Sequence, residues 1–439
     1  FFVLVRGFCC AHAAVAVVVL SSPFSRAHRP RCHAEPVSQM PRPIFVAATR
    51  QHVGKTTVSL ALMSGLQKRF GKVGFIKPVG QQHISLNDEK GHTIRVDKDV
   101  QVMKEYFRLD HVNYGDMSPV IIPKGYTARY IDGGISSAGQ AEAIKDAFNS
   151  QSSTSEIVLV EGTGHVGVGS IVELSNAHAA ALVGADVVLV ANGGLGSAFD
   201  ELEMNRQMFA HEGVAVRGVV LNKVQPGKVD MVREKMTKLL RERWGVPLLG
   251  VVPDLPFLGE ASLQSLESAL SAELIAGEKC RSLHYGTDDA FLVTTGLRRF
   301  LRRAFEQRAE WRRPLFVTHA TRDDLLLGFL AHHQKKMKQQ DGRVSGKTDW
   351  AGAMILSVGA SKAFPDLDDG FPDDVQPLEY LLKMAKATDA PVLITKLGTV
   401  DALERVRSFT AKHTINDQVR VQAAIDHYEP QIDFDVLLR

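Results

Sequence analysis

The run Phe45–Thr57, F-V-A-A-T-R-Q-H-V-G-K-T-T, contains residues that can hold the phosphates of a nucleotide. An apolar stretch typical of a buried strand leads into Gly-Lys-Thr, and a helix-compatible stretch follows. In such a P-loop, backbone N–H groups and the helix N-terminus face the phosphates, a lysine neutralises them and a hydroxyl reaches Mg²⁺. The sequence therefore predicts a site for a nucleoside triphosphate, with cofactor-binding residues Thr49, Gly54, Lys55, Thr56 and Thr57.

The motif departs from the full P-loop pattern at one position, and its Gly-Lys-Thr core occurs twice in the chain. Thr49 stands where G-x-x-x-x-G-K-[ST] has its first glycine. A Gly-Lys-Thr tripeptide is also weak evidence alone, because Gly346-Lys347-Thr348 occurs in the same chain. That second copy has no strand before it and Asp341 at the first-glycine position, so we interpret it as a loop.

Other polar residues follow apolar runs. Glu161 ends V-L-V-E and could hold Mg²⁺ beside Thr56, although a carboxylate there can also cap the next turn. Lys77 follows the second predicted strand and could bind a phosphate or a substrate carboxylate above the sheet edge, or lie at the surface. Asn222 ends G-V-V-L and could read a purine edge. Asp99 opens a predicted helix, where a negative charge favours the helix dipole.

The elements that must position these residues alternate between strand and helix from Ile44 to about Leu255, which predicts an α/β fold with a parallel sheet covered by helices on both faces. The expected strands are Val/Ile/Leu runs, typical of strands buried on both faces, at Ile44–Ala47, Val73–Ile76, Ile157–Val160, Val187–Val190, Gly218–Leu221 and Leu248–Val252. The expected helices include Val58–Phe70, Asp97–Phe107, Gly139–Ser150 and Val229–Trp244.

A second, smaller α/β unit is predicted to begin near Ala290. A helical linker from about Ala261 to Glu278 precedes it. The expected strands of the second unit are Pro314–Thr318, Ala353–Ser357 and Pro391–Thr395, each followed by a helix-compatible stretch.

Composition argues against nucleic acid as a partner. The chain has 439 residues, 45% hydrophobic and 23% charged, as is ordinary for a globular protein with two or three domains. Its net charge of +3 comes from the segment before Met40, which has four arginines and one glutamate. The remainder has 48 basic and 48 acidic residues, so it offers no electrostatic attraction for a polyanion.

The first 39 residues are read separately from the fold. They are apolar, carry arginines and hold three of the four cysteines, and they allow three interpretations: a signal segment, an organelle transit segment, or an extension before a true start at Met40. Cys280 is the one cysteine after Met40, which predicts a reducing compartment: the cytoplasm if Met40 is the start, or a plastid or other organelle if the leader is a transit segment. No later run predicts a membrane span.

Residues 44–255 resemble the dethiobiotin synthetase-like P-loop proteins, whose fold is shared with the cobyrinic acid diamide synthases. The matching strings occur in the family's order: A-T-R-Q-H-V-G-K-T-T, K-P-V-G, D-K-D-V, V-E-G-T-G-H-V-G-V-G-S, L-S-N-A, N-G-G-L-G and V-L-N-K-V. The fourth string is the specific one, and it is similar to the variant in the N-terminal part of long phosphate acetyltransferases. Residues from about 290 resemble the DRTGG domain that follows it there, through T-R-D-D, L-S-V-G and P-V-L-I-T-K-L-G-T-V-D-A.

This resemblance implies a leader over 1–39, a P-loop domain over 40–258, a helical linker over 259–289 and a DRTGG-like domain over 290–439. It also implies ATP and Mg²⁺ as cofactors. The metal ligands would be Thr56, Asp99 and Glu161, Lys77 would contact a substrate anion, and Asn222 would contact the adenine.

Three residues depart from the family pattern. Ala48 replaces the glycine that opens the synthetase loop, and Gln81 stands where dethiobiotin synthetase has a serine that helps to hold its carbamate. Dethiobiotin formation is therefore not expected. Arg50 replaces an acid or a small polar residue and lies five residues before Lys55, where related dimeric ATPases place a lysine that reaches the partner's nucleotide. We treat a homodimer with such a contact as a hypothesis.

The sequence is consistent with two candidate functions, an enzyme and a regulatory module. The first is ATP-dependent activation of a small carboxylate or carbamate, with Lys55 and Lys77 as catalytic residues. The alternative is a non-catalytic, nucleotide-sensing module whose C-terminal domain contacts a metabolic enzyme. A polar cavity behind Lys77 would favour the enzyme, and a closed apolar wall there with an exposed patch on the second domain would favour the module. We expect neither acetyl transfer, whose domain would follow the DRTGG domain, nor amidotransfer, for which Cys280 is not placed.

Overall fold

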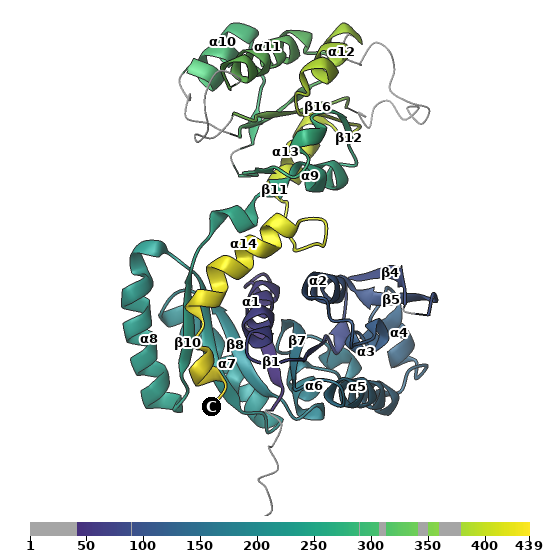
Figure 1. Cartoon of the computed structure of the whole chain (residues 1–439), viewed down its shortest axis with the longest axis vertical. Coiled ribbons are helices and arrows are strands. Elements are labelled where there is room, and N and C mark those ends of the chain that lie inside the picture. Colours follow the sequence, from purple (N-terminus) through teal and green to yellow (C-terminus); the bar gives the residue numbers. More distant parts are fainter. Residues whose placement is uncertain (1–41, 89, 289, 307–312, 341–349, 360–378) are drawn as a thin grey trace, which may run out of the picture. The chain divides into compact units, whose positions relative to one another are not determined.

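The computed structural model describes residues 42–439 except 89, 289, 307–312, 341–349 and 360–378 (Figure 1). The leader and the second Gly-Lys-Thr therefore lie outside the described residues. Residues Met40–Arg439 form one compact unit, whose described part contains a six-stranded sheet, a five-stranded sheet and three two-stranded sheets. Within the described part of the chain, no helix is both long and apolar enough to cross a bilayer.

The first sheet has six strands, all parallel, in the order β10-β9-β8-β1-β7-β2. The strands are β1 (Ile44–Ala48), β2 (Val73–Ile76), β7 (Ile157–His165), β8 (Asp186–Asn192), β9 (Val216–Val224) and β10 (Leu248–Pro253). All six predicted strands are confirmed, and β1 lies in the middle of the sheet. Figure 1 shows this sheet with helices around it.

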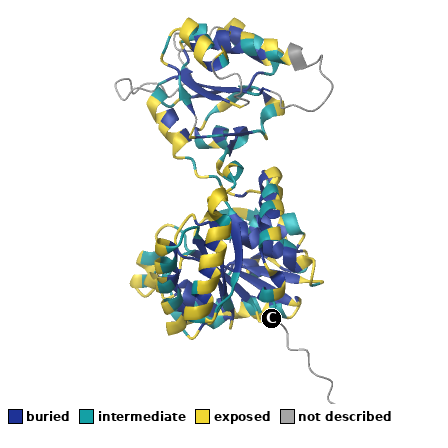
Figure 2. Ribbon diagram, turned by 90° about the vertical axis from the view of Figure 1, so that its left-hand side faces the viewer, coloured by how far each residue is buried: buried dark blue, intermediate teal, exposed yellow. Residues whose placement is uncertain are grey.

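Alternate residues of β1 face two separate cores. Ile44, Val46 and Ala48 pack into one apolar cluster with α1 (Lys55–Gln67), and Phe45 and Ala47 pack into the other. This period-2 alternation follows from strand geometry, and both faces are apolar because helices cover both. The first face also carries α2 (Lys98–Phe107), α14 (Gln418–Tyr428) and α15 (Phe434–Leu437), and the second carries α5 (Ser137–Ser152), α6 (Asn176–Leu182), α7 (Gly196–His211) and α8 (Val229–Trp244). Figure 2 shows the strands buried beneath helices whose outer sides are exposed.

The excursion between β2 and β7 contains elements that the sequence did not predict. The antiparallel hairpin of β4 (His83–Asn87) and β5 (Thr93–Asp97) leads directly into α2. After α2 come α3 (Tyr114–Met117), β6 (Val120–Ile121) and α4 (Tyr126–Ile131), and β6 pairs with β3 (Val79–Gly80), which precedes the hairpin. The hairpin matters for the site because its last residue, Asp97, is also the N-cap of α2.

The second sheet has five strands in the order β12-β17-β16-β15-β14, and β12 alone runs antiparallel to its neighbour. These strands are β12 (Glu273–Ala276), β14 (Phe291–Leu292), β15 (Leu315–His319), β16 (Ala353–Ser357) and β17 (Val392–Thr395). One face packs on α10 (Leu297–Leu301), α11 (Asp323–Gln340) and α12 (Glu379–Thr388), and the other on α9 (Leu263–Ala269) and α13 (Thr399–Arg407). The expected second, smaller α/β unit is thus present.

Two details of the predicted organisation are wrong. The stretch 259–289 is not a helical linker, because besides α9 it contains β12, which completes the second sheet, and β11 (Ala261–Ser262) paired with β13 (His284–Tyr285). Among the described residues from Gln418 onward, the buried apolar side chains that belong to a core cluster lie in the core of the first sheet and not in the clusters of the second. Val421, Ile425 and Phe434 belong to the same core cluster as α1, and Figure 1 shows the yellow helix α14 beside α1.

Candidate functional site

The P-loop is held in shape by backbone geometry and one buried amide. Gly54 adopts a left-handed conformation, with φ of 97°, at the point where α1 begins. Asn222 Nδ2 at the end of β9 donates to Val53 O over 2.7 Å, and a Cβ on Gly54 would lie only 2.4 Å from that nitrogen. Only glycine fits here, because both the positive φ and the close amide exclude a side chain.

Two residues predicted to bind the cofactor have other places in the structure. The Thr49 hydroxyl donates to Glu201 Oε2 over 2.9 Å, so its side chain is directed at α7. Asn222 is fully buried, and its Oδ1 accepts from the backbone N–H of Lys223 over 2.7 Å. Neither residue lines the cavity described below. Asn222 supports the loop from beneath through these two bonds to the backbone, and its expected contact with the adenine stays a prediction.

Four other predicted residues, Thr56, Lys77, Asp99 and Glu161, lie close together. Thr56 Oγ1 lies 2.9 Å from Glu161 Oε1 and 3.5 Å from Asp99 Oδ2. Lys77 Nζ donates to Asp97 Oδ1 over 2.8 Å and to Asp99 Oδ2, and lies 3.9 Å from Glu161 Oε1. The parallel register explains the meeting, because Glu161 on β7 pairs with Val46 on β1, just before the loop. These distances bring Thr56, Lys77, Asp99 and Glu161 together beside the P-loop, and their expected roles stay predictions.

Asp97 is a site residue that the sequence reading missed. Besides Lys77, its carboxylate accepts from the backbone N–H groups of Asp99, Gln81 and Gln82. It therefore fixes the start of α2 and the loop after β3 at once. A carboxylate directly before a helix is an N-cap signal, and the D-K-D-V string contained that signal.

The electrostatics of this cluster follow from burial and from charge pairing. Burial raises the pKa of Glu161, and the nearby Lys77 opposes that rise. Burial also opposes ionisation of Asp99, but the charge and hydrogen bond of Lys77 outweigh it and lower the pKa of Asp99. Burial of Lys77 works against its charge, yet Asp99, Glu161 and Asp97 together raise its pKa above the ordinary value. Lys77 is therefore a permanent cation among three carboxyl groups.

The pKa of Lys55 is shifted in the opposite direction from the pKa of Lys77. Its Nζ donates to Gly164 O over 3.3 Å, at the end of β7. Burial lowers the pKa of Lys55, and the charge of Glu161 only partly offsets this. An anion that enters the loop would stabilise the ammonium form, so Lys55 is suited to meeting incoming phosphates.

Thr56, Asp99 and Glu161 fit the donor set of a Mg²⁺ ion. All three offer oxygen, and Glu161 Oε2 is buried with no hydrogen-bond partner among the described residues. No cluster of three or more His, Cys, Asp or Glu side chains with a metal-binding arrangement occurs in the described chain. Mg²⁺ beside nucleotide phosphates needs no such cluster, because one or two carboxylates, water and phosphate oxygens complete its shell.

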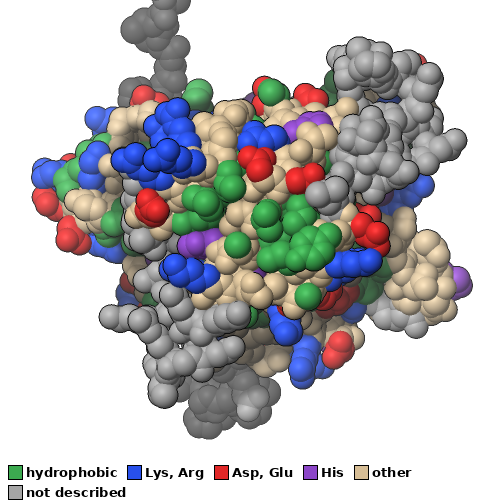
Figure 3. All heavy atoms as spheres, turned by 90° about the horizontal axis from the view of Figure 1, so that it is seen from above, with side chains coloured by type: hydrophobic (Ala, Val, Ile, Leu, Met, Phe, Trp, Pro, Cys, Tyr) green, Lys and Arg blue, Asp and Glu red, His purple; other side chains and the backbone are tan. Residues whose placement is uncertain are grey.

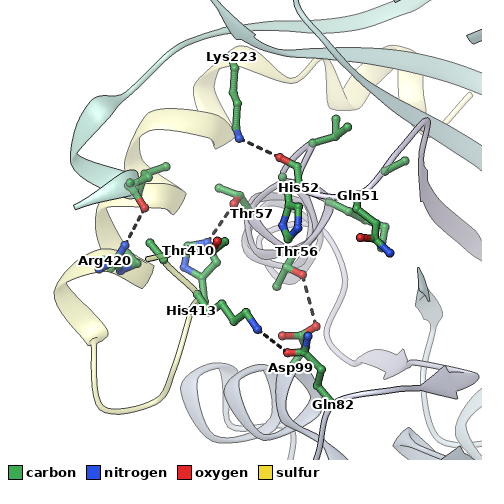
Figure 4. A pocket seen from close by; sticks show the side chains of 18 of the residues that line it. Gln51, His52, Thr56, Thr57, Gln82, Asp99, Lys223, Thr410, His413 and Arg420 are labelled. Atoms are coloured by element: carbon green, nitrogen blue, oxygen red, sulfur yellow. Dashed lines mark hydrogen bonds between the residues drawn. The ribbon is translucent and has the colours of Figure 1, made fainter. Parts of the chain in front are cut away.

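These residues line a cavity of about 740 Å³ whose walls come from distant parts of the sequence. The loop residues Arg50–Thr57 form one side, and Lys77, Gln81, Gln82, Asp97 and Asp99 extend it on the other. Figure 4 shows His413 from the C-terminal segment pointing at Thr57, with Lys223 reaching the carbonyl of His52. No motif marks His413 in the sequence, so the sequence reading did not include it.

Two other residues singled out in the sequence have ordinary surroundings. Arg50 lines the cavity and lies 3.6 Å from Glu201 Oε1, while its side chain is largely exposed. Its proposed reach to a second copy stays a prediction. Cys280 is a free, half-buried thiol whose pKa is raised by burial, so it has no sign of an activated nucleophile.

A family model described as an AAA domain (AAA_26) matches residues 42–262, about half of the chain. The chain belongs to this family. Its sequence is 24% identical over 412 residues to the phosphate acetyltransferase of Pseudomonas aeruginosa, covering 90% of this chain and 51% of that protein. It is 30% identical over 135 residues to the cobyric acid synthase of Carboxydothermus hydrogenoformans, covering 30% of this chain and 27% of that protein. The chain thus spans about half the length of the phosphate acetyltransferase and is homologous to its N-terminal region.

Solved structures match at lower similarity. The MinC:MinD cell division protein complex of Aquifex aeolicus has a TM-score of 0.31 at 15% identity, covering 49% of this chain and 83% of that chain. A plasmid partition protein of Borrelia burgdorferi bound to AMPPNP has a TM-score of 0.32 at 12% identity, covering 49% of this chain and 88% of that chain.

Proposed function

We propose that this chain binds ATP together with Mg²⁺ and uses it to activate a small carboxylate or carbamate. The observation that carries the proposal is the meeting of Lys55, Thr56, Lys77, Asp99 and Glu161 around one cavity. Phosphoryl transfer needs little more from a protein than positioning and stabilisation of charge. Mg²⁺, held by Thr56, Asp99 and Glu161, would supply charge neutralisation at the phosphate oxygens.

Lys55 and Lys77 have separate roles in this proposal. Lys55 would meet the phosphates at the loop. Lys77 has three N–H donors, of which Asp97 and Asp99 accept two, and the remaining one can hold the attacking anion. Because Lys77 keeps its positive charge in this cluster, it would orient the anion without taking a proton from it.

The polar character of the cavity around Lys77 favours an enzyme. Gln81, Gln82, Asp97 and Thr163 line it beside Lys77, so this wall is neither closed nor apolar. A binding pocket for a small polar acid needs a few placed polar groups of this kind.

A nucleotide-sensing module is the second candidate. It is supported by exposed apolar side chains in the second α/β unit, for example Tyr380 in α12, which is 71% exposed. Figure 3, which views one face of the molecule, shows hydrophobic side chains gathered between charged ones. Apolar surface rimmed by charge is suited to a protein partner.

Steady-state turnover separates the two candidates. Mg²⁺-dependent ATP hydrolysis by the wild type, lost in Lys55→Ala and in Glu161→Ala, would support the enzyme, and small carboxylates that stimulate it would then identify the substrate class. Tight ATP binding without turnover under any of these additions would support the module.

A further inference from the structure

A histidine from the C-terminal segment is in direct contact with the P-loop. His413 Nε2 lies 3.0 Å from Thr57 Oγ1, and both side chains are buried. Thr57 follows the Gly-Lys-Thr tripeptide and lines the cavity with His413, although 356 positions separate the two in the sequence. Among the described residues, Thr57 Oγ1 has no other hydrogen-bond partner.

The segment that carries His413 is anchored on both sides of the site. Asp417 caps α14, and the buried Arg420 donates to Asp417 and to the carbonyls of Leu258 and Glu260. Nearer to the loop, Lys412 Nζ donates to Gln82 Oε1 over 2.8 Å. His413 is thus held between fixed points, so its contact with Thr57 has a defined geometry.

The hydrogen-bonding capacity of His413 indicates which atom donates. Burial lowers the pKa of His413 to about 4, so the ring is neutral and carries one N–H. Nδ1 is buried with no hydrogen-bond partner among the described residues. A buried N–H without an acceptor is rarer than a buried lone pair without a donor. The proton is therefore assigned to Nε2, which donates to Thr57 Oγ1.

We infer that His413 is a positioning residue, which orients the Thr57 hydroxyl so that its own proton points at a phosphate of the bound nucleotide. This inference rests on the proposed nucleotide binding and adds to it a residue from outside the P-loop family match, which ends at residue 262. The nucleotide site is then built by two parts of the chain, and the segment between α13 and α14 belongs to it.

Thermodynamic linkage requires that ATP binding and the stability of the segment that carries His413 affect each other equally. If the segment between Arg407 and Gln418 supports nucleotide binding, the nucleotide must stabilise that segment by the same free energy. ATP should therefore slow backbone amide exchange around His413, at a distance in sequence from every P-loop residue.

The test compares ATP affinity in the full chain by calorimetry. His413→Ala is expected to weaken ATP binding about tenfold, as for loss of one hydrogen bond to a group at a charged ligand. His413→Asn, whose amide can still donate, is expected to recover most of the affinity. His178→Ala is the matched control, because His178 is also hydrogen-bonded, to Glu212, and does not line the cavity.

A double-mutant cycle separates positioning from general damage. Adding His413→Ala to Thr57→Val should cause little further loss, because the hydroxyl that His413 orients is already gone. Additive losses would overturn the inference, as would wild-type affinity or tighter binding in His413→Ala. A wild type that binds no ATP would instead overturn the proposed function on which the inference rests, so the two failures are distinguishable.

Discussion

Lys77 is the residue on which the electrostatics of the site depend. Its ammonium is held by Asp97 and Asp99 with Glu161 close by, and its side chain is only 8% exposed. Removal of a buried cation from such a cluster leaves buried carboxylates without a compensating charge. The resulting loss of folding stability is larger than the net stability that the intact ion pair contributes. The residue therefore stabilises the empty site as well as serving the proposed reaction.

Lys77→Met is accordingly expected to lower the free energy of unfolding by about 3 kcal/mol at neutral pH. Denaturant unfolding measures this. Lys72→Met, an exposed lysine just before β2, is the control and should change stability by less than about 0.5 kcal/mol. The loss in Lys77→Met should shrink in acid, as the carboxyl groups take up protons. Wild-type stability in Lys77→Met would show that the cluster is not ionised as described.

The buried imidazole of His413 predicts a pH dependence of stability. Its folded pKa of about 4 lies below the ordinary value of 6.5, so the unfolded state binds the proton first as pH falls. The contribution of His413 to the free energy of unfolding is therefore complete above about pH 6.5, and it declines as pH falls from about 6.5 to about 4. His413→Asn should lose less stability than the wild type across this window, as measured by denaturant unfolding at each pH. Parallel pH profiles would contradict the burial of a neutral His413.

The residue types of the site were largely predictable, and their partners were not. Strand-end position and the P-loop motif indicated Lys55, Thr56, Lys77 and Glu161, because parallel strands bring their carboxyl ends together. The hydrogen bonds of Thr49 to Glu201 and of Asn222 to the backbone were not predicted, since a motif position does not reveal which neighbour a side chain bonds. His413 could not be found, because its contact depends on where a remote helix packs.

Among the helices, α1 is in close contact near its C-terminal end with the ring of Phe434 from α15. A Cβ on Gly65 would lie 2.0 Å from Phe434 Cζ, so the aromatic ring of α15 occupies the space that a side chain would need. Ser64 in the same helix and Lys68, its C-cap residue, both contact Glu429. The C-terminal segment thus packs closely against α1, through the Phe434 ring over Gly65 and the contacts of Glu429 with Ser64 and Lys68.

Gly65→Ala is therefore expected to destabilise the protein by about 1–3 kcal/mol through overpacking, although alanine favours a helix more than glycine does. Gly139→Ala in α5 is the matched control. The nearest atom to its added Cβ is 3.8 Å away, so it should be neutral or stabilising by up to about 1 kcal/mol. Thermal unfolding of both variants decides the matter, and equal effects would mean that Phe434 does not fill this space.

Strands were predicted better than the connections between them. The six strands of the first sheet are buried Val/Ile/Leu runs, and such runs have few alternatives in an α/β chain. The hairpin β4–β5 was missed, because its strands are polar and half-exposed. Strand β12 was read as helix, since E-L-I-A is too short for periodicity to distinguish the two.

At the scale of the whole molecule, the P-loop core is not contiguous in sequence. The family match ends at residue 262, yet Val421, Ile425, Tyr428, Phe434 and Leu437 are buried in the cluster that contains α1. Arg420 also bonds the carbonyls of Leu258 and Glu260, so the two distant stretches meet there. The first sheet therefore needs the end of the chain to cover one of its faces.

A fragment of residues 42–262 is expected to be insoluble or to unfold well below the full chain, because the surface under α14 and α15 would be exposed. Joining residues 414–439 to it through a short Gly/Ser linker should restore a cooperative unfolding transition. Circular dichroism during heating measures both. A fragment of 42–262 that is soluble and as stable as the full chain would show that the C-terminal helices are not part of this core.

The proposed nucleotide site is tested by equilibrium binding of ATP to the full chain, with and without Mg²⁺ and with Lys55→Ala alongside the wild type. We expect binding that Mg²⁺ strengthens and that Lys55→Ala weakens at least about tenfold, because the loop lysine meets the phosphates. Thermal unfolding of Lys55→Ala would establish that the variant is folded. ATP binding that is absent from the wild type, or unchanged by both Mg²⁺ and Lys55→Ala, would show that the P-loop is not a nucleotide site.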